Sequence, residues 1–150
     1  LMHMHRDPQT MQVAPMDGDV VPQVRHFLEQ AGQTLQAQGV QKNRIVLDPG
    51  VGFGKTVAQN FALLARQAEL LQAGYPLLLG GSRKSSIGAA LQGDAAEPPP
   101  PAARVTGSVA AALMAVERGA AVVRVHDVRE TVQALQVLAA VRAAGERPGA

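Results

Sequence analysis

The sequence predicts an α/β fold in which parallel strands alternate with helices. Short apolar runs without polar alternation, at Ile45–Leu47 and Leu77–Leu79, are typical of strands that are covered on both faces. Amphipathic stretches with helical spacing lie between such runs, and glycine ends most of them. Strands and helices in this order form parallel sheets, whose ligands bind beyond the carboxyl ends of the strands. We therefore expect a binding site at those ends.

Composition limits the class of protein. The chain has 150 residues, of which 47% are hydrophobic and 17% charged, which suits one soluble domain with a core. No apolar run reaches the roughly 20 residues of a membrane span, and no signal-peptide pattern opens the chain. The lack of cysteine excludes disulfides and thiolate metal sites and agrees with a cytoplasmic location. Scattered bases, a net charge of +2 and 3% aromatic residues argue against nucleic-acid binding.

Each strand is expected to lead into a helix. The predicted strands are Leu1–Met4, Arg44–Asp48, Leu77–Gly80 and Ala121–Val125. The predicted helices, given by the first and last apolar residue of each pattern, are Val24–Leu35, Val57–Leu71, Ser85–Leu91, Val105–Val116 and Val128–Leu138. The expected helix caps are Asp17 or Asp19, the capping box of Thr56 and Gln59, and Asp127 with Glu130. Residues 93–103 contain four consecutive prolines and are expected to form a mobile surface loop, and residues 146–150 a frayed tail.

The stretch Arg44–Lys55, RIVLDPGVGFGK, has the composition of a binding loop at a strand end. Asp48 closes the strand, and glycines at positions 50, 52 and 54 permit positive φ and close approach of a ligand before Lys55. The spacing fits neither a P-loop nor a dinucleotide fingerprint. A glycine-rich turn with a structural aspartate is the alternative interpretation.

Basic residues follow two of the other strands. Ser82–Ser85, SRKS, lies where a strand meets a helix, so backbone N–H groups with Arg83 or Lys84 favour an anion, although Ser82 as an ordinary helix cap is the alternative. Arg124 and His126 share one side of their strand by period-two alternation and can face one ligand, unless His126 is purely structural. The strand ends thus offer an acid for the N–H edge of a ring and bases for an anion.

The strings LMHM, LDPGVGFGK, GGSRKS, RVTGS and RVHDV, in this order and spacing, resemble the carboxyl-terminal half of the dihydropteroate synthase family. The resemblance covers essentially the whole chain. It implies a TIM (β/α)8 barrel, of which residues 1–150 would form a single pterin-binding fragment, a half barrel of about four βα units. It also implies a transferase that condenses 6-hydroxymethyl-7,8-dihydropterin pyrophosphate with p-aminobenzoate, giving 7,8-dihydropteroate and pyrophosphate in folate biosynthesis.

The resemblance assigns roles to residues that match the motifs of the family. Asp48 would bind the amino and N–H edge of the pterin, and Lys84 would contact the pterin oxygen and a ring nitrogen. Arg124 would stack on the ring and reach the diphosphate, which His126 would help to hold. We take these four as the catalytic residues, and their contribution would be positioning and charge stabilisation, since diphosphate leaves before the amine attacks.

The remaining substrate-binding residues also follow from the resemblance. Phe53 and Ser85 would border the p-aminobenzoate pocket, Met2 would line the pterin pocket, and Val125 is counted with the site although its side chain is expected to point away. No residue of this chain is expected to bind metal, because the Mg²⁺ ligand of the family would lie in the amino-terminal half.

The resemblance further implies a homodimer through the last helices, and these 150 residues alone are expected to be inactive. Two alternatives stay open: a folate-binding methyltransferase domain of similar barrel fold, and a non-catalytic half-barrel binding module.

Overall fold

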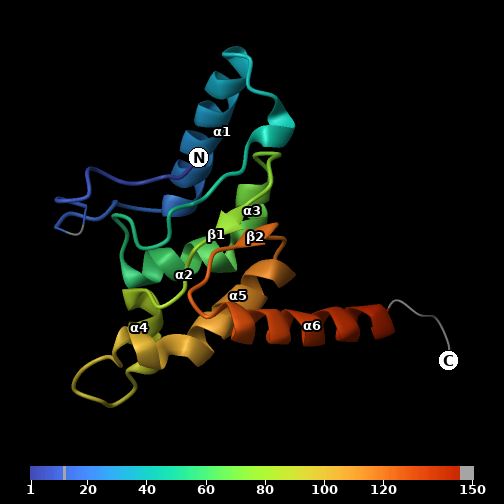
Figure 1. Cartoon of the computed structure of the whole chain (residues 1–150). Helices are drawn as coiled ribbons and strands as arrows, with labels where there is room; N and C mark the ends of the chain where they lie inside the picture. Colours follow the sequence, from blue (N-terminus) through green and yellow to red (C-terminus); the bar gives the residue numbers. More distant parts are fainter. Residues whose placement is uncertain (12, 146–150) are drawn as a thin grey trace.

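The computed structural model describes residues 1–11 and 13–145 (Figure 1). Its elements in chain order are α1 Val20–Ala37, the 3-10 helix Lys42–Arg44, α2 Val57–Ala65, α3 Gln67–Leu71, β1 Leu78–Leu79, α4 Ser85–Leu91, the 3-10 helix Pro101–Arg104, α5 Val105–Glu117, β2 Val122–Val123 and α6 Val128–Gly145. The mixed α/β composition is confirmed, but among the described residues only two of the four predicted strands form, and both are shorter than expected. The predicted strands Leu1–Met4 and Arg44–Asp48 make only isolated bridges, and Arg44 belongs to a 3-10 helix. The predicted fraying of residues 146–150 lies outside the described residues.

Four extended segments pair in parallel, and they do so in chain order. Met2 pairs with Asp48, Leu47 pairs with Leu77, and β1 pairs with β2, with Leu78 opposite Val122. Every crossover thus leads to the neighbouring segment, so the carboxyl ends of all four segments meet at one edge. The helices follow the same order, since α1 contacts α2 and α3, α2 contacts α4, and α5 contacts both α4 and α6.

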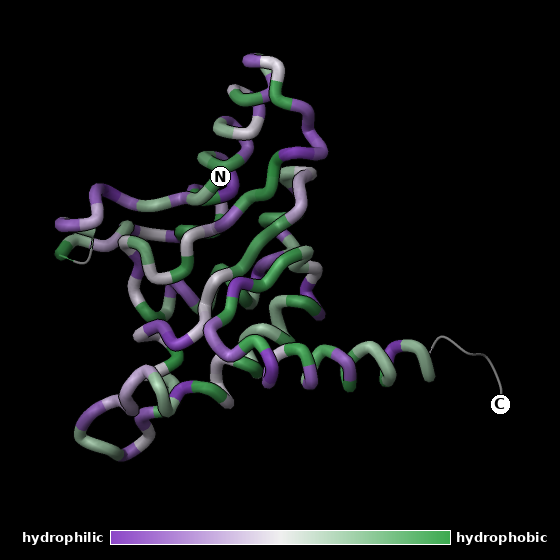
Figure 2. The backbone as a smooth tube through the Cα atoms, in the orientation of Figure 1, coloured by the Kyte–Doolittle hydropathy of each residue, from purple (hydrophilic) through white to green (hydrophobic). Residues whose placement is uncertain are grey.

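The core lies between the extended segments and the helices that cover them. Its largest fully buried side chains include Leu28, Leu47, Leu63, Leu70 and Leu77. Figure 2 shows that the extended segments in the middle of the molecule are mostly hydrophobic. They are the framework that holds the strand-end loops in place.

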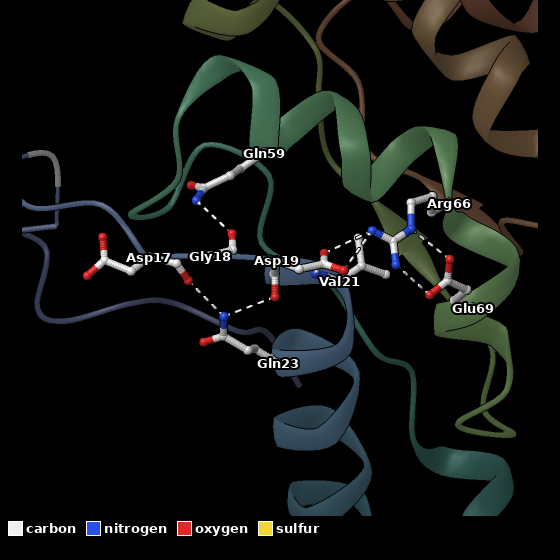
Figure 3. Close-up of polar contacts among 8 residues, drawn as sticks. All are labelled: Asp17, Gly18, Asp19, Val21, Gln23, Gln59, Arg66 and Glu69. Atoms are coloured by element: carbon white, nitrogen blue, oxygen red, sulfur yellow. Dashed lines mark hydrogen bonds and ion pairs between the residues drawn. The ribbon is translucent and has the colours of Figure 1, made fainter.

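The ends of α1 and α2 are fixed by the caps that the sequence predicts. Asp19, rather than Asp17, caps α1 by accepting a hydrogen bond from the Val21 N–H. Thr56 and Gln59 form the expected capping box of α2. The Gln59 side chain also donates to the carbonyl of Gly18, so that it joins the start of α2 to the start of α1 (Figure 3).

The predicted helix from Val57 to Leu71 is wrong as a single helix, because it breaks at Arg66. There the backbone leaves helical geometry, with φ −103° and ψ 27°. The guanidinium of Arg66 pairs with Asp19 at 2.9 Å and with Glu69 at 2.7 Å (Figure 3). The break separates α2 from α3, and the ion pairs join both to α1, a long-range arrangement that local periodicity does not encode.

Burial of the last strand and helix differs from the prediction. Val122 is 43% exposed, because β1 is its one strand neighbour within the described residues. On α6, Val128 and Val132 belong to the predicted apolar stripe, yet both are exposed, whereas Thr131 is buried. The stripe is partly covered, because α6 packs against α5 and Leu135 and Leu138 are half-buried. Figure 1 shows the carboxyl-terminal part of α6 projecting beyond α5.

Two further expectations concern Asp127 and the proline-rich loop. The Asp127 carboxylate accepts hydrogen bonds from Arg83, and its backbone carbonyl accepts from Thr131 at the start of α6.

In the proline-rich loop, Pro100 has the polyproline geometry of φ −62° and ψ 158°, and a 3-10 helix begins at Pro101. The mobility of residues 93–103 stays a prediction. No helix in the described part of the chain has the length and apolar character needed to cross a membrane.

Candidate functional site

A cavity of about 360 Å³ opens at the edge where the strands end. It is lined by Gly80, Ser82, Lys84, Arg124, Val125 and His126. These residues come from the loop after β1 and the loop after β2, which are neighbours because the two strands pair in parallel. The structure therefore brings together four of the predicted site residues from two loops that are distant in the sequence: Lys84, Arg124, Val125 and His126.

Lys84 lies at the N-cap position of α4 and is half-buried. Its ammonium donates a hydrogen bond to the Val51 carbonyl and lies 4.4 Å from the centre of the Phe53 ring. Burial lowers the pKa of Lys84, the charge of Arg124 lowers it further, and the charge of Asp48 opposes this shift. Lys84 thus links the cavity to the glycine-rich loop. Its ammonium interacts electrostatically with Asp48 on one neighbouring strand end and with Arg124 on the other.

Arg124 and His126 both line the cavity, but so does Val125 between them, whose side chain was expected to point away, because all three residues lie beyond the end of β2. The Arg124 side chain lies across Gly80, where an added Cβ would come within 3.3 Å of the Arg124 Nε. His126 donates its backbone N–H to the Ser82 hydroxyl at 3.2 Å, and its ring Nδ1 lies 3.1 Å from the same oxygen. Val125 lines this cavity and also a smaller one beneath α5.

Asp48 and Met2 lie side by side on the neighbouring strand ends, outside the residues that line the cavity. They form a parallel bridge, and Asp48 Oδ1 accepts a hydrogen bond from the Gly50 N–H at 2.8 Å. Gly50 has a φ of 67°, and a Cβ there would lie 1.8 Å from the His3 carbonyl oxygen. Glycine is therefore required at this position for the loop to pass so close to the first strand.

Lys55, which the sequence suggests as a binding-site base, has a different role in the structure. It is 4% exposed, and its ammonium contacts His3 Nδ1 at 3.0 Å and donates to the carbonyls of Gly50 and Phe53 at 2.9 and 3.0 Å. Burial lowers the pKa of Lys55 to about 8. Lys55 therefore stabilises the conformation of the glycine-rich loop from the buried side.

Phe53 and Ser85 border the site without lining the cavity. The Phe53 ring lies under the Lys84 ammonium, and Ser85 is exposed as the first residue of α4. The structure thus gathers Lys84, Arg124, Val125 and His126 around one cavity and leaves Met2, Asp48, Phe53 and Ser85 beside it along the same edge.

Two polar residues support the site: Ser82, which the sequence places at this strand end, and Asn60, which the sequence did not indicate. Ser82 is 6% exposed and bonds to His126 rather than capping α4. Asn60 is 3% exposed, accepts from the Gly52 N–H at 2.7 Å and donates to the Ser86 hydroxyl at 2.9 Å, which ties the glycine-rich loop to α4. A buried amide within an apolar helix face was the available signal for Asn60.

The cavity suits a flat ring that carries an anion. Lys84, Arg124 and His126 are hydrogen-bond donors around it, and the Arg124 guanidinium offers a planar face as well as a fork. The Asp48 carboxylate lies on the neighbouring strand end and accepts a hydrogen bond from the Gly50 N–H. Among the described residues, no group of three His, Cys, Asp or Glu side chains could hold a metal ion.

Comparison with known families identifies the chain. Residues 1–126 match the family described as pterin binding enzyme. The chain belongs to this family. Dihydropteroate synthase from Escherichia coli K12 is 47% identical over 147 residues, which are 97% of this chain and 50% of that protein. The synthase from Neisseria meningitidis serogroup B is 49% identical over 91% of this chain and 47% of its own length.

Solved structures of dihydropteroate synthases have the same fold over nearly all of this pterin-binding chain. Burkholderia cenocepacia dihydropteroate synthase, complexed with 7,8-dihydropteroate, is 52% identical with a TM-score of 0.87, covering 98% of this chain and 53% of that one. The Xanthomonas albilineans enzyme with 4-aminobenzoic acid is 45% identical with a TM-score of 0.83, covering 95% and 48%. The chain therefore spans about half the length of the relatives that it matches.

Proposed function

We propose that the protein carrying this chain is a dihydropteroate synthase, which makes 7,8-dihydropteroate from 6-hydroxymethyl-7,8-dihydropterin pyrophosphate and p-aminobenzoate. The main support is the cavity at which Lys84, Arg124 and His126 meet, since it offers a planar cation and further donors for a ring that bears a diphosphate. The similarity to synthases that bind dihydropteroate and 4-aminobenzoic acid supports the choice of substrates.

We further propose that the chain forms half of a (β/α)8 barrel. Its four extended segments pair in parallel and in chain order, as strands of such a barrel do, and a whole barrel has eight strands in about 250 residues. The match to about half the length of each relative agrees with this proportion. The expected consequence is that the 150 residues alone do not turn over substrate.

The residues of the chain act by binding and by charge. The reaction breaks the bond between the pterin methylene carbon and the diphosphate, forms a carbon–nitrogen bond to the arylamine and releases one proton. Arg124 and His126 bind the diphosphate and stabilise the negative charge that develops on it, and Arg124 also stacks on the pterin. Lys84 and Asp48 orient the pterin through its oxygen and its N–H edge.

The p-aminobenzoate is proposed to bind beside the pterin, between Phe53 and Ser85. The Phe53 ring stays in place because the Lys84 ammonium lies over it, and Ser85 is open to solvent at the start of α4. Met2, in register with Asp48, lines the pterin side. We assign no Mg²⁺ ligand to this chain and expect that ligand in the amino-terminal half of the barrel.

The decisive experiment measures dihydropteroate formation by the full gene product, with Mg²⁺ and both substrates. Lys84→Ala and Asp48→Ala are each expected to reduce kcat/KM by about 100-fold or more, because both remove contacts to the reacting ring. Lys42→Ala, on an exposed 3-10 helix, is the matched control and should retain activity. Pterin binding without turnover would favour a non-catalytic module, and methyl transfer from a folate would favour a methyltransferase.

We also propose a homodimer through α6 and a cytoplasmic location. The exposed fractions of Val128, Val132, Val137 and Val141 on α6 lie between 46% and 66%. Val128 and Val132 lie on one face of the helix and Val137 and Val141 on the opposite face, and a second copy would cover the Val137 and Val141 face. Light scattering on the full gene product should give the mass of a dimer. Val137→Lys with Val141→Lys should give a monomer, while Arg129→Ala on the same helix should not.

A further inference from the structure

Arg83 has a backbone conformation that requires support. Its φ is 58°, in the left-handed region that residues with a Cβ seldom adopt. Such a conformation persists only where several neighbours fix it. Arg83 stands between Ser82 and Lys84, both of which line the cavity, so its backbone determines the direction in which those two side chains leave the loop.

The backbone of Arg83 is held from the side of α5. Its N–H donates to the Ser108 hydroxyl at 2.9 Å, and its carbonyl accepts from the Arg104 guanidinium at 2.9 Å. The Ser108 hydroxyl in turn donates to the Arg104 carbonyl at 2.7 Å. These contacts fix the peptide groups on both sides of Arg83 against the amino-terminal end of α5.

The side chain of Arg83 is held from the other side. Its Nε donates to Asp127 Oδ2 at 3.0 Å, and its terminal nitrogen donates to Asp127 Oδ1 in a two-point ion pair. The Asp127 side chain is 9% exposed. The pair raises the pKa of Arg83 and lowers the pKa of Asp127. It joins the loop after β1 to the loop after β2, and it engages the fork of Arg83 within the protein.

Ser82 makes a second connection between the same two loops. Its hydroxyl oxygen accepts from the backbone N–H of His126 at 3.2 Å and lies 3.1 Å from the ring Nδ1, to which the hydroxyl can donate its proton. A neutral His126 ring that accepts at Nδ1 carries its proton on Nε2. With the Ser82 hydroxyl as the donor to Nδ1, the ring presents Nε2–H as its own donor.

We propose that Ser82 and the Arg83–Asp127 ion pair are positioning groups, which lock the two strand-end loops together and hold His126 as an Nε2 donor beside Lys84. Arg83 is then a support of the site rather than one of its anion ligands. The kinetic consequence rests on the proposed synthase function, whereas the state of the His126 ring does not.

The test uses the full gene product and variants that keep the loop backbone. Arg83→Asn removes the ion pair with a residue that tolerates positive φ, and Arg83→Gly is the second variant in case the first does not fold. Asp127→Asn removes the pair from the other side, and the double variant completes the cycle. Arg129→Ala, an exposed base two residues after Asp127, is the control.

Each single variant is expected to reduce kcat/KM by about 10-fold, and the double variant should be no worse than the more affected single one. Nitrogen NMR of the His126 ring should show the Nε2–H form in the wild type, a shifted tautomer ratio in Ser82→Ala, and similar changes in Arg83→Asn and Asp127→Asn. If the wild type makes no product, the synthase proposal fails and the NMR signals still test the positioning.

A second experiment measures the binding of inorganic pyrophosphate to the wild type and the variants, and it can contradict the proposal. If Arg83 is an anion ligand, Asp127→Asn frees its guanidinium and tightens pyrophosphate binding, while Arg83→Asn weakens it. Changes in opposite directions would overturn the proposal, as would a His126 ring signal that is unchanged in Ser82→Ala. Equal weakening in the Arg83 and Asp127 variants, with no change in Arg129→Ala, supports it.

Discussion

Acid is expected to destabilise this protein through one buried histidine, His3. The ring is 6% exposed, its Nδ1 faces the Lys55 ammonium at 3.0 Å, and it packs edge-on against Phe27. Burial, together with the charges of Lys55 and His5, lowers the pKa of His3 from 6.5 to about 4. The folded protein thus keeps this ring neutral where the unfolded chain protonates it.

The sign and the size of the effect follow from this difference. Between pH 6.5 and pH 4 the unfolded chain binds a proton that the folded protein does not, so the free energy of unfolding falls as the pH falls. At about 1.4 kcal/mol per pKa unit the loss has an upper limit of about 3 kcal/mol, and we expect about 2 kcal/mol after solvent screening. The stability is fully present above pH 6.5 and lost below pH 4.

The measurement compares the wild type with His3→Asn, whose side-chain oxygen replaces Nδ1 as an acceptor for Lys55 and does not titrate. Urea unfolding at several values between pH 4 and pH 7 gives the free energy of unfolding for each. The variant loses the packing against Phe27 at every pH, so only the slopes are compared. Equal slopes in both proteins would refute the linkage, and NMR titration of the His3 ring checks its pKa directly.

Three further predictions concern the loops that carry the site, and urea unfolding tests each of them. Gly50→Ala should cost about 4 kcal/mol or more, because the new Cβ would lie 1.8 Å from the His3 carbonyl oxygen, whereas Gly93→Ala, with φ 52° and open space, should cost only about 1–2 kcal/mol; equal losses would contradict the clash. Thr56→Ala should cost about 1 kcal/mol through the lost capping box of α2, and no loss would show that the cap adds nothing. Lys55→Met should cost about 3 kcal/mol, because the hydrogen bonds of the ammonium to the carbonyls of Gly50 and Phe53 and its contact with His3 Nδ1 are lost, and a stability like that of the wild type would contradict this role.

Much of the site was predictable because its residues follow strands that local patterns reveal. Apolar runs placed the strand ends, and Arg124 and His126 follow the last of them and line one cavity together with Val125. The ligand roles of Asp48, Met2, Phe53 and Ser85 stay predictions, since these residues border the cavity without lining it.

The sequence by itself determined the order of extended segments and helices, a cap at Asp17 or Asp19, the capping box at Thr56, and the edge at which we expect the site. These features depend on neighbours within a few residues, which the sequence displays directly. Only the tertiary structure decided that Lys55 is buried against His3 and that Arg83 pairs with Asp127, since these partners lie 52 and 44 residues apart. The sequence states the charge of a side chain, but the partner and the burial of that side chain depend on which segments the fold brings together.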